Sequence, residues 1–249
     1  MSRKDVPEQA SGLAFGIPTL DAILGGGLAR SRVHEVYAAE PDDAVAVVGF
    51  AMALTARFSD GGRTALWLRS LRAARGSGVF QAQGWRELGG IPGNGLVGVV
   101  PDTMALLRVA VEAVRCPGLG AVVVESWGVM RELDLTASRR LALAAEKSGV
   151  PLLLLRIDAD LVPSAAQTRW QVASAPSVAL PGNAPGFPCF DVTLLRQRSG
   201  PSGQSWRLEW DRDQCQFREA PLSGAVFSVP VDRSAAQRTG GERPSRRAA

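Results

Sequence analysis

Apolar and polar positions alternate along this chain in blocks of two lengths. Between residues 33 and 157, short apolar runs of strand length are separated by stretches long enough for helices. The predicted strands are 33–38, 64–68, 96–100, 120–125 and 152–157. This alternation is typical of β-α-β units that build a parallel sheet.

Three of the separating stretches have helical features. Residues 43–58 are rich in Ala, Val and Leu, and residues 101–114 start with a proline, which suits a first helical turn. A further helix is predicted over 136–148, with Thr136 as its N-cap and Gly149 as its stop. Residues 69–95 are glycine-rich and irregular, and only a short helix near 79–88 is expected there.

The pattern changes after residue 157. A loop over 159–168 and strands over 169–172 and 190–197 are predicted, and the turn Ser-Gly-Pro-Ser-Gly at 199–203 leads into a strand over 205–210. Such hairpin-connected strands pair antiparallel and can extend a parallel sheet at its edge. The predicted fold class is therefore α/β, with a mainly parallel sheet flanked by helices and antiparallel C-terminal edge strands.

Charge and composition set the predicted domain limits. We expect a flexible segment over 1–12, a core domain over 13–218 and a disordered tail over 219–249. Residues 232–249 carry five arginines against two acidic residues, a net charge of +3 within a total of +4, so the rest of the chain carries +1. The apolar runs are too short to span a membrane and no secretory leader is recognisable at the start, so a cytoplasmic location is expected.

The residue inventory excludes several kinds of chemistry. The only lysines, Lys4 and Lys147, do not follow a glycine, so a phosphate-binding loop of the form GxxxxGK[ST] cannot occur. A single histidine, His34, lies in a strand-like run, where a structural role is favoured over catalysis. The three cysteines fit no metal-binding or disulfide pattern. Metal sites and cofactors are not expected.

Two motifs carry a family resemblance. The sequence FGIPTLDAILGGGL at 15–28, followed by RVHEVY at 32–37, resembles the start of RecA-like ATPase domains. The segments LDLTASRRLALAAE at 133–146 and TRWQV at 168–172 are similar to the ImuA family, the RecA-like inducible mutagenesis proteins of bacterial translesion-synthesis cassettes. The resemblance covers about residues 13–218.

The chain departs from RecA where that resemblance implies the phosphate-binding loop. Ala44 stands at the place of the lysine and Val45 at that of the Mg²⁺-holding hydroxyl. Glu40, Asp42 and Asp43 would repel phosphate, but acidic residues are favourable in the first turn of a helix. A structural cap is therefore the favoured interpretation of this degenerate loop.

The resemblance also implies catalytic groups that are missing. Arg69 follows the second strand where RecA carries a water-activating glutamate, and Asp158 stands where RecA has its nucleotide-sensing glutamine. Glu125 keeps a carboxylate at the Walker B position, either as a hydrogen-bonded strand-end residue or as a relic Mg²⁺ contact. ATP binding in the RecA manner is not expected, and the protein is predicted not to be an enzyme.

Arginines and one tryptophan are the candidate contact residues, although a solvated surface is the favoured explanation of the arginine clusters in the core. Candidate partner or DNA contacts are Arg69, Arg72, Arg75, Trp85, Arg139, Arg140, Arg243, Arg246 and Arg247. Because the core carries only +1, weak single-stranded DNA contact is the most that is expected.

The resemblance implies a non-catalytic accessory protein of SOS-induced mutagenic translesion synthesis and DNA repair, located in the cytoplasm at the nucleoid. Its implied partners are ImuB, the associated error-prone DnaE-type polymerase and RecA. Two alternatives stay open: a SulA-type cell-division inhibitor, and an ATP-dependent DNA-binding ATPase of the recombinase kind.

Overall fold

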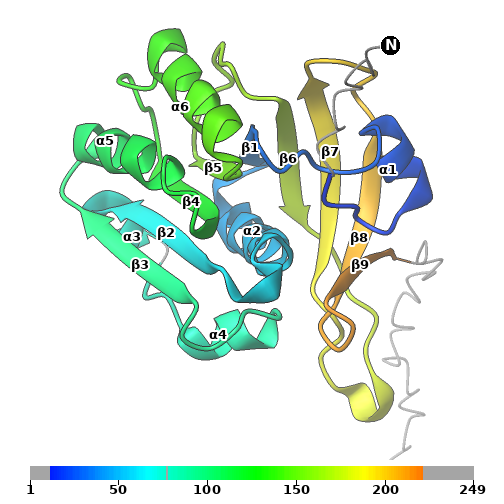
Figure 1. The fold of residues 1–249 in the computed structure, drawn as a ribbon. Helices are drawn as coiled ribbons and strands as arrows, with labels where there is room; N and C mark the ends of the chain where they lie inside the picture. Colours follow the sequence, from blue (N-terminus) through cyan, green and yellow to red (C-terminus); the bar gives the residue numbers. More distant parts are fainter. Residues whose placement is uncertain (1–11, 77, 221–249) are drawn as a thin grey trace, which may run out of the picture.

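A nine-stranded mixed sheet forms the centre of the computed structural model, which describes residues 12–76 and 78–220 (Figure 1). The strand order is β3-β2-β4-β5-β1-β6-β7-β8-β9. The strands are β1 Val33–Ala38, β2 Thr64–Ser70, β3 Gly95–Val100, β4 Leu119–Trp127, β5 Leu152–Ile157, β6 Thr168–Ser174, β7 Cys189–Gln197, β8 Ser205–Asp211 and β9 Gln216–Glu219. Strands β1 to β6 pair in parallel, and β7, β8 and β9 continue the sheet antiparallel. The predicted fold class is confirmed.

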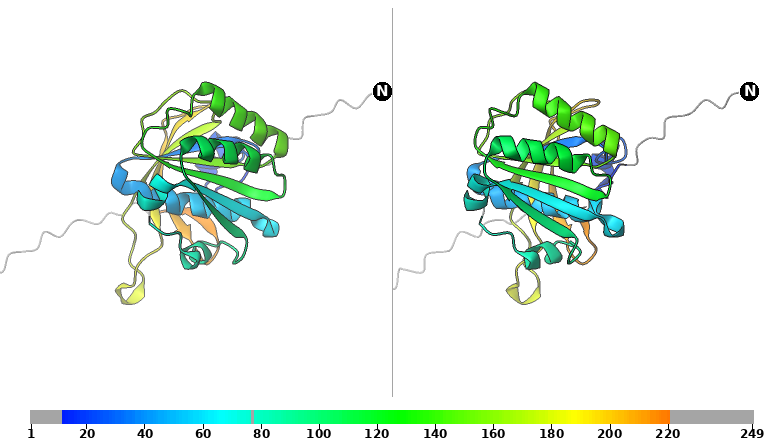
Figure 2. Two further views of the ribbon diagram at one scale, coloured as in Figure 1. Left: turned by 90° about the vertical axis from the view of Figure 1, so that its left-hand side faces the viewer. Right: turned by 60° about the vertical axis from the view of Figure 1, so that its left-hand side comes forward.

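Helices cover both faces of the sheet (Figures 1 and 2). The α-helices are α1 Pro18–Ile23, α2 Ala44–Phe58, α3 Leu71–Gly76, α4 Ala82–Glu87, α5 Thr103–Val114 and α6 Leu135–Ser148, and short 3₁₀ turns are η1 Pro41–Asp43, η2 Asp60–Gly62 and η3 Pro181–Asn183. One core lies between α2 and the sheet, around Phe50 and Trp170. A second core lies between the sheet and the pair α5 and α6, around Leu106 and Leu141. The strands between them are buried on both faces, which explains their continuous apolar runs.

Several predicted boundaries are wrong by a few residues. Helix α5 starts after Pro101, because the Asp102 carboxylate caps it by accepting from the Ala105 amide at 2.8 Å. Asp134, not Thr136, caps α6 in the same way through the Ala137 amide at 2.7 Å. Gly149 ends α6 at φ 79°, as predicted. Helices α1 and α3 and strand β9 are too short for periodicity to reveal.

None of the helices in the described part of the chain combines the length and apolarity that a membrane crossing requires. The predicted C-terminal tail lies outside the described residues apart from its first two positions, and most of the predicted N-terminal segment lies outside them as well.

Candidate functional site

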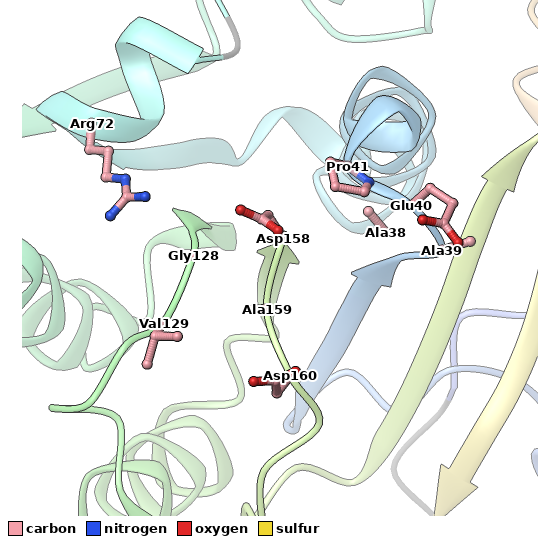
Figure 3. A pocket seen from close by; sticks show the side chains of 10 residues that line it. All are labelled: Ala38, Ala39, Glu40, Pro41, Arg72, Gly128, Val129, Asp158, Ala159 and Asp160. Carbon is pink, nitrogen blue, oxygen red and sulfur yellow. The ribbon is translucent and has the colours of Figure 1, made fainter.

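The carboxyl ends of β1, β4 and β5 form the edge of the sheet that we call the sheet edge. They surround a cavity of about 540 Å³, the sheet-edge cavity (Figure 3). Its lining residues are Ala38, Ala39, Glu40, Pro41, Arg72, Gly128, Val129, Asp158, Ala159 and Asp160. Crevices at the carboxyl ends of parallel strands are the usual ligand sites of open α/β sheets. This is also where the RecA resemblance places the phosphate-binding loop, so its residues decide whether a nucleotide fits.

The turn after β1 is held by its own acidic residues. The Asp43 carboxylate accepts from the Glu40 amide at 3.2 Å, and both the amide and the hydroxyl of Ser174 donate to it at 2.8 Å. Partial burial disfavours the ionised form, but these hydrogen bonds outweigh it and hold the pKa of Asp43 below its usual value. The predicted structural cap is confirmed, and it also ties the start of α2 to β6.

The groups that would receive phosphate are absent from the cavity. Ala44 is buried and Val45 is exposed over 81% of its surface, and neither side chain can bind an anion or a metal. Figure 3 shows Asp158 and Asp160 at the cavity with Glu40 on its far side from Arg72. Three carboxylates thus face one guanidinium. A nucleoside triphosphate does not fit this charge distribution.

Glu125 and Arg69 form a buried ion pair across β4 and β2. Arg69 Nη2 donates to Glu125 Oε1 at 3.0 Å, and the Trp67 indole N–H donates to Glu125 Oε2 at 2.8 Å. Arg69 Nη1 also donates to the Gly78 carbonyl at 2.8 Å. The carboxylate is 1% exposed and both its oxygens are engaged, so its contacts are those of a structural residue, which lies within β4 two positions before its end. The prediction that Arg69 contacts a partner is wrong, because its guanidinium is buried and binds Glu125 and the Gly78 carbonyl.

Trp85 is also misassigned as a surface contact. It is 5% exposed, and its indole N–H donates to the Ile91 carbonyl at 3.3 Å. The ring lies against Gly90, where an added Cβ would come within 2.0 Å of it. The glycine-rich stretch that suggested exposure instead makes room for the ring, so Trp85 cannot be an interface anchor in this conformation.

The remaining arginine candidates divide between two surfaces. Arg72 and Arg75 are exposed on α3, and Arg72 lines the sheet-edge cavity. Arg139 and Arg140 are exposed on α6, and Arg140 lines a groove between α5 and α6. The sheet thus separates the two pairs instead of gathering them into one site. Arg243, Arg246 and Arg247 lie outside the described residues.

His34 has the structural role predicted for it. Its Nδ1 lies 2.8 Å from Thr168 Oγ1, which receives the Trp170 indole N–H, and its Nε2 lies 2.8 Å from the Ala29 carbonyl. These partners assign the proton to Nε2. Burial lowers the pKa of His34 to about 4, so the ring is neutral near pH 7. Over residues 12–76 and 78–220, no cluster of His, Cys, Asp and Glu is arranged to hold a metal ion.

Two groups of residues escaped the sequence reasoning. Glu35 and Arg169 form a second buried ion pair at 2.7 Å, and Arg169 Nη2 donates to the Ser164 hydroxyl at 2.9 Å, which fixes the loop before β6. Arg115 and Lys147 line the α5–α6 groove with Arg140. The spacing of Arg140 and Lys147 on one helix face was a usable signal, but nothing in the sequence placed Arg115 beside them.

The fold is that of an α/β protein with a mixed sheet, and its sequence contains no phosphate-binding loop of the form GxxxxGK[ST]. No family model matches the chain. The ImuA proteins of two strains of Caulobacter vibrioides are each 33% identical to it over 213 residues, which cover 79% of this chain and 82% of the relative. The chain therefore belongs to the ImuA family. It also aligns with the crystal structure of the RadB recombinase at a TM-score of 0.49 and 14% identity, over 84% of this chain and 100% of that one.

Proposed function

We propose that this protein is a non-catalytic accessory protein of mutagenic translesion DNA synthesis, which acts by docking onto other proteins. Membership of the ImuA family supports the process. The proposed lack of catalytic activity is supported by the turn from Glu40 to Asp43. Its carboxylates lie where the family resemblance implies a phosphate-binding loop. This role belongs in the cytoplasm, at the nucleoid.

Electrostatics supports the loss of nucleotide binding. A phosphate charge about 4 Å from one carboxylate costs about 4 kcal/mol at an effective dielectric constant of about 20. That cost is as large as the binding free energy of a millimolar ligand. Glu40, Asp158 and Asp160 all line the cavity, and Arg72 offsets only part of their charge. The protein therefore keeps a RecA-like shape without a nucleotide switch.

The proposed partners are ImuB with its error-prone DnaE-type polymerase and, through surfaces of the shared fold, RecA. A docking protein without a nucleotide switch should bind equally well whether or not ATP is present. This is what separates the proposal from an ATP-dependent recombinase-like activity.

Size-exclusion chromatography with light scattering tests the proposal. The full chain is mixed with purified ImuB and, separately, with RecA, each with and without ATP and single-stranded DNA. We expect a complex of defined stoichiometry with at least one of them, unchanged by ATP. The absence of a complex with both proteins, or a complex that forms only with ATP, would overturn the proposal.

A further inference from the structure

A groove runs between α5 and α6, on the face of the sheet opposite α2. Two adjoining cavities of about 610 and about 800 Å³ form it, and they share Arg115 and Arg140 in their linings. Figure 2 shows the two helices side by side on this face. Neither cavity shares a lining residue with the sheet-edge cavity, so the groove is a separate site.

The smaller cavity is lined by cationic and apolar residues with no carboxylate among them. Arg115, Arg140 and Lys147 supply three positive charges. Within residues 12–76 and 78–220, neither Arg140 nor Lys147 has a carboxylate partner. Two acidic residues on these helices have other partners, since Glu112 pairs with Arg115 at 2.8 Å and Glu146 pairs with Arg32 at 3.0 Å. The end of the groove formed by the smaller cavity therefore presents two positive charges, those of Arg140 and Lys147, that no ion pair of the described residues neutralises.

An exposed apolar side chain lies between these charges. Leu143 is 66% exposed and follows Arg140 by three positions and precedes Lys147 by four, so the three side chains share one face of α6. Ala144 lines the same cavity beside it. An isolated exposed leucine needs no explanation, but a leucine framed by two unpaired cations matches an apolar side chain framed by carboxylates.

We infer that the α5–α6 groove binds an acidic segment of a partner protein, whose apolar side chain packs on Leu143 and whose carboxylates face Arg140 and Lys147. The inference rests on the proposed docking function and names the surface and the chemistry of the partner. The chain's own C-terminal region does not suit this groove, because residues 232–249 carry a net charge of +3.

Nucleic acid fits the groove less well than an acidic protein segment. A phosphate backbone needs several adjacent cations, since its affinity comes from counterion release. The larger cavity instead brings Glu112, Glu132 and Asp134 close to the cations, and these carboxylates would repel neighbouring phosphates. Leu143 also offers a backbone of phosphates nothing to bind. An acidic peptide can place its charges at the cationic end alone.

Fluorescence anisotropy with a defined peptide tests the inference. The probe is a labelled peptide of about 16 residues, made of Glu with Leu at helical spacing. We expect saturable binding to the full chain, weakened at least about tenfold by Arg140→Glu combined with Lys147→Glu. Leu143→Ser should weaken it several-fold even in about 0.5 M salt, where charge effects are screened. Replacing Leu by Ser in the peptide should have the same effect.

The matched control is Arg63→Glu combined with Arg198→Glu. It makes the same change in net charge at exposed positions outside the lining of the groove. We expect binding within about twofold of the original chain, because distant charges are screened. Thermal unfolding of both double variants confirms that they fold. Equal weakening by the control pair, no binding of the peptide, or displacement of the peptide by single-stranded DNA of the same length would overturn the inference.

Binding of ImuB and RecA distinguishes a wrong assignment of the groove from a wrong proposed function. If ImuB or RecA binds the Arg140→Glu, Lys147→Glu variant as well as it binds the original chain, the groove assignment is wrong and docking uses another surface. If neither protein binds the original chain, the proposed function is wrong whatever the peptide does.

Discussion

The sheet edge and the α5–α6 groove differ in whether particular charged side chains have a partner within the protein. At the edge, Glu125 is paired with Arg69 and Asp43 is bound to Ser174, so these side chains hold neighbouring elements together. In the groove, Arg140 and Lys147 have no carboxylate partner among the described residues. The charges that pair within the fold thus lie near the carboxyl ends of β1, β2 and β4, whereas Arg140 and Lys147 lie unpaired on α6, where the proposed partner would bind.

The largest loss of stability is expected from a substitution of Glu125. Glu125→Gln leaves the Arg69 charge buried without its counterion, so we expect a loss of about 3 to 5 kcal/mol in unfolding free energy, measured by urea denaturation. Arg69→Met combined with Glu125→Leu should recover most of that loss, because it removes both charges. A Mg²⁺-dependent stability that disappears in Glu125→Gln would contradict the structural role.

His34 extends the test to a buried polar group that lines neither the sheet-edge cavity nor the groove. Its pKa is lowered from 6.5 to about 4 by burial, so the unfolded chain binds the proton first and stability falls as the pH drops from about 6.5 towards 4. We expect a loss of about 2 to 3 kcal/mol between pH 7.5 and pH 4.5. Urea denaturation at both values measures it. His34→Gln should flatten this dependence, and an equally steep curve in that variant would assign the effect to other groups.

Gly90→Ala tests whether the Trp85 ring is buried against Gly90 and so unavailable for recognition. The new Cβ would meet the indole ring at 2.0 Å, so we expect a loss of about 1 to 3 kcal/mol in unfolding free energy. Gly84→Ala is the matched control, since open space surrounds that position in α4, and it should be neutral or slightly stabilising. Equal thermal stability of the two variants would show that Trp85 does not fill this space.

Asp43→Ala gives the smallest expected change. It removes the bonds to Ser174 and the Glu40 amide, and the loss of such a cap costs about 1 kcal/mol. Because the pKa of Asp43 is lowered, its contribution is present above the ordinary carboxyl pKa near 4 and is lost on further acidification. Thermal unfolding should therefore show a smaller difference between variant and original chain at pH 3 than at pH 7. An equal difference at the two pH values would argue against the carboxylate bonds.

The sequence predicts the parallel strands well and side-chain partners poorly. Strands such as β5 lie between two helical layers, so their uninterrupted apolar runs are visible without a structure. Arg69 was misplaced because β2 continues to Ser70, and only the register with β4 shows that Arg69 faces Glu125. Periodicity along one helix reveals Arg140, Leu143 and Lys147, but their neighbour Arg115 belongs to another helix. Pairings between distant segments require the fold.

Isothermal titration of the full chain with Mg²⁺ and ATP directly tests the proposed loss of nucleotide binding at the sheet edge. We expect no saturable binding at ATP concentrations up to about 1 mM, since the carboxylates at the sheet edge cancel the binding free energy that such an affinity requires. Stoichiometric, Mg²⁺-dependent binding would contradict it.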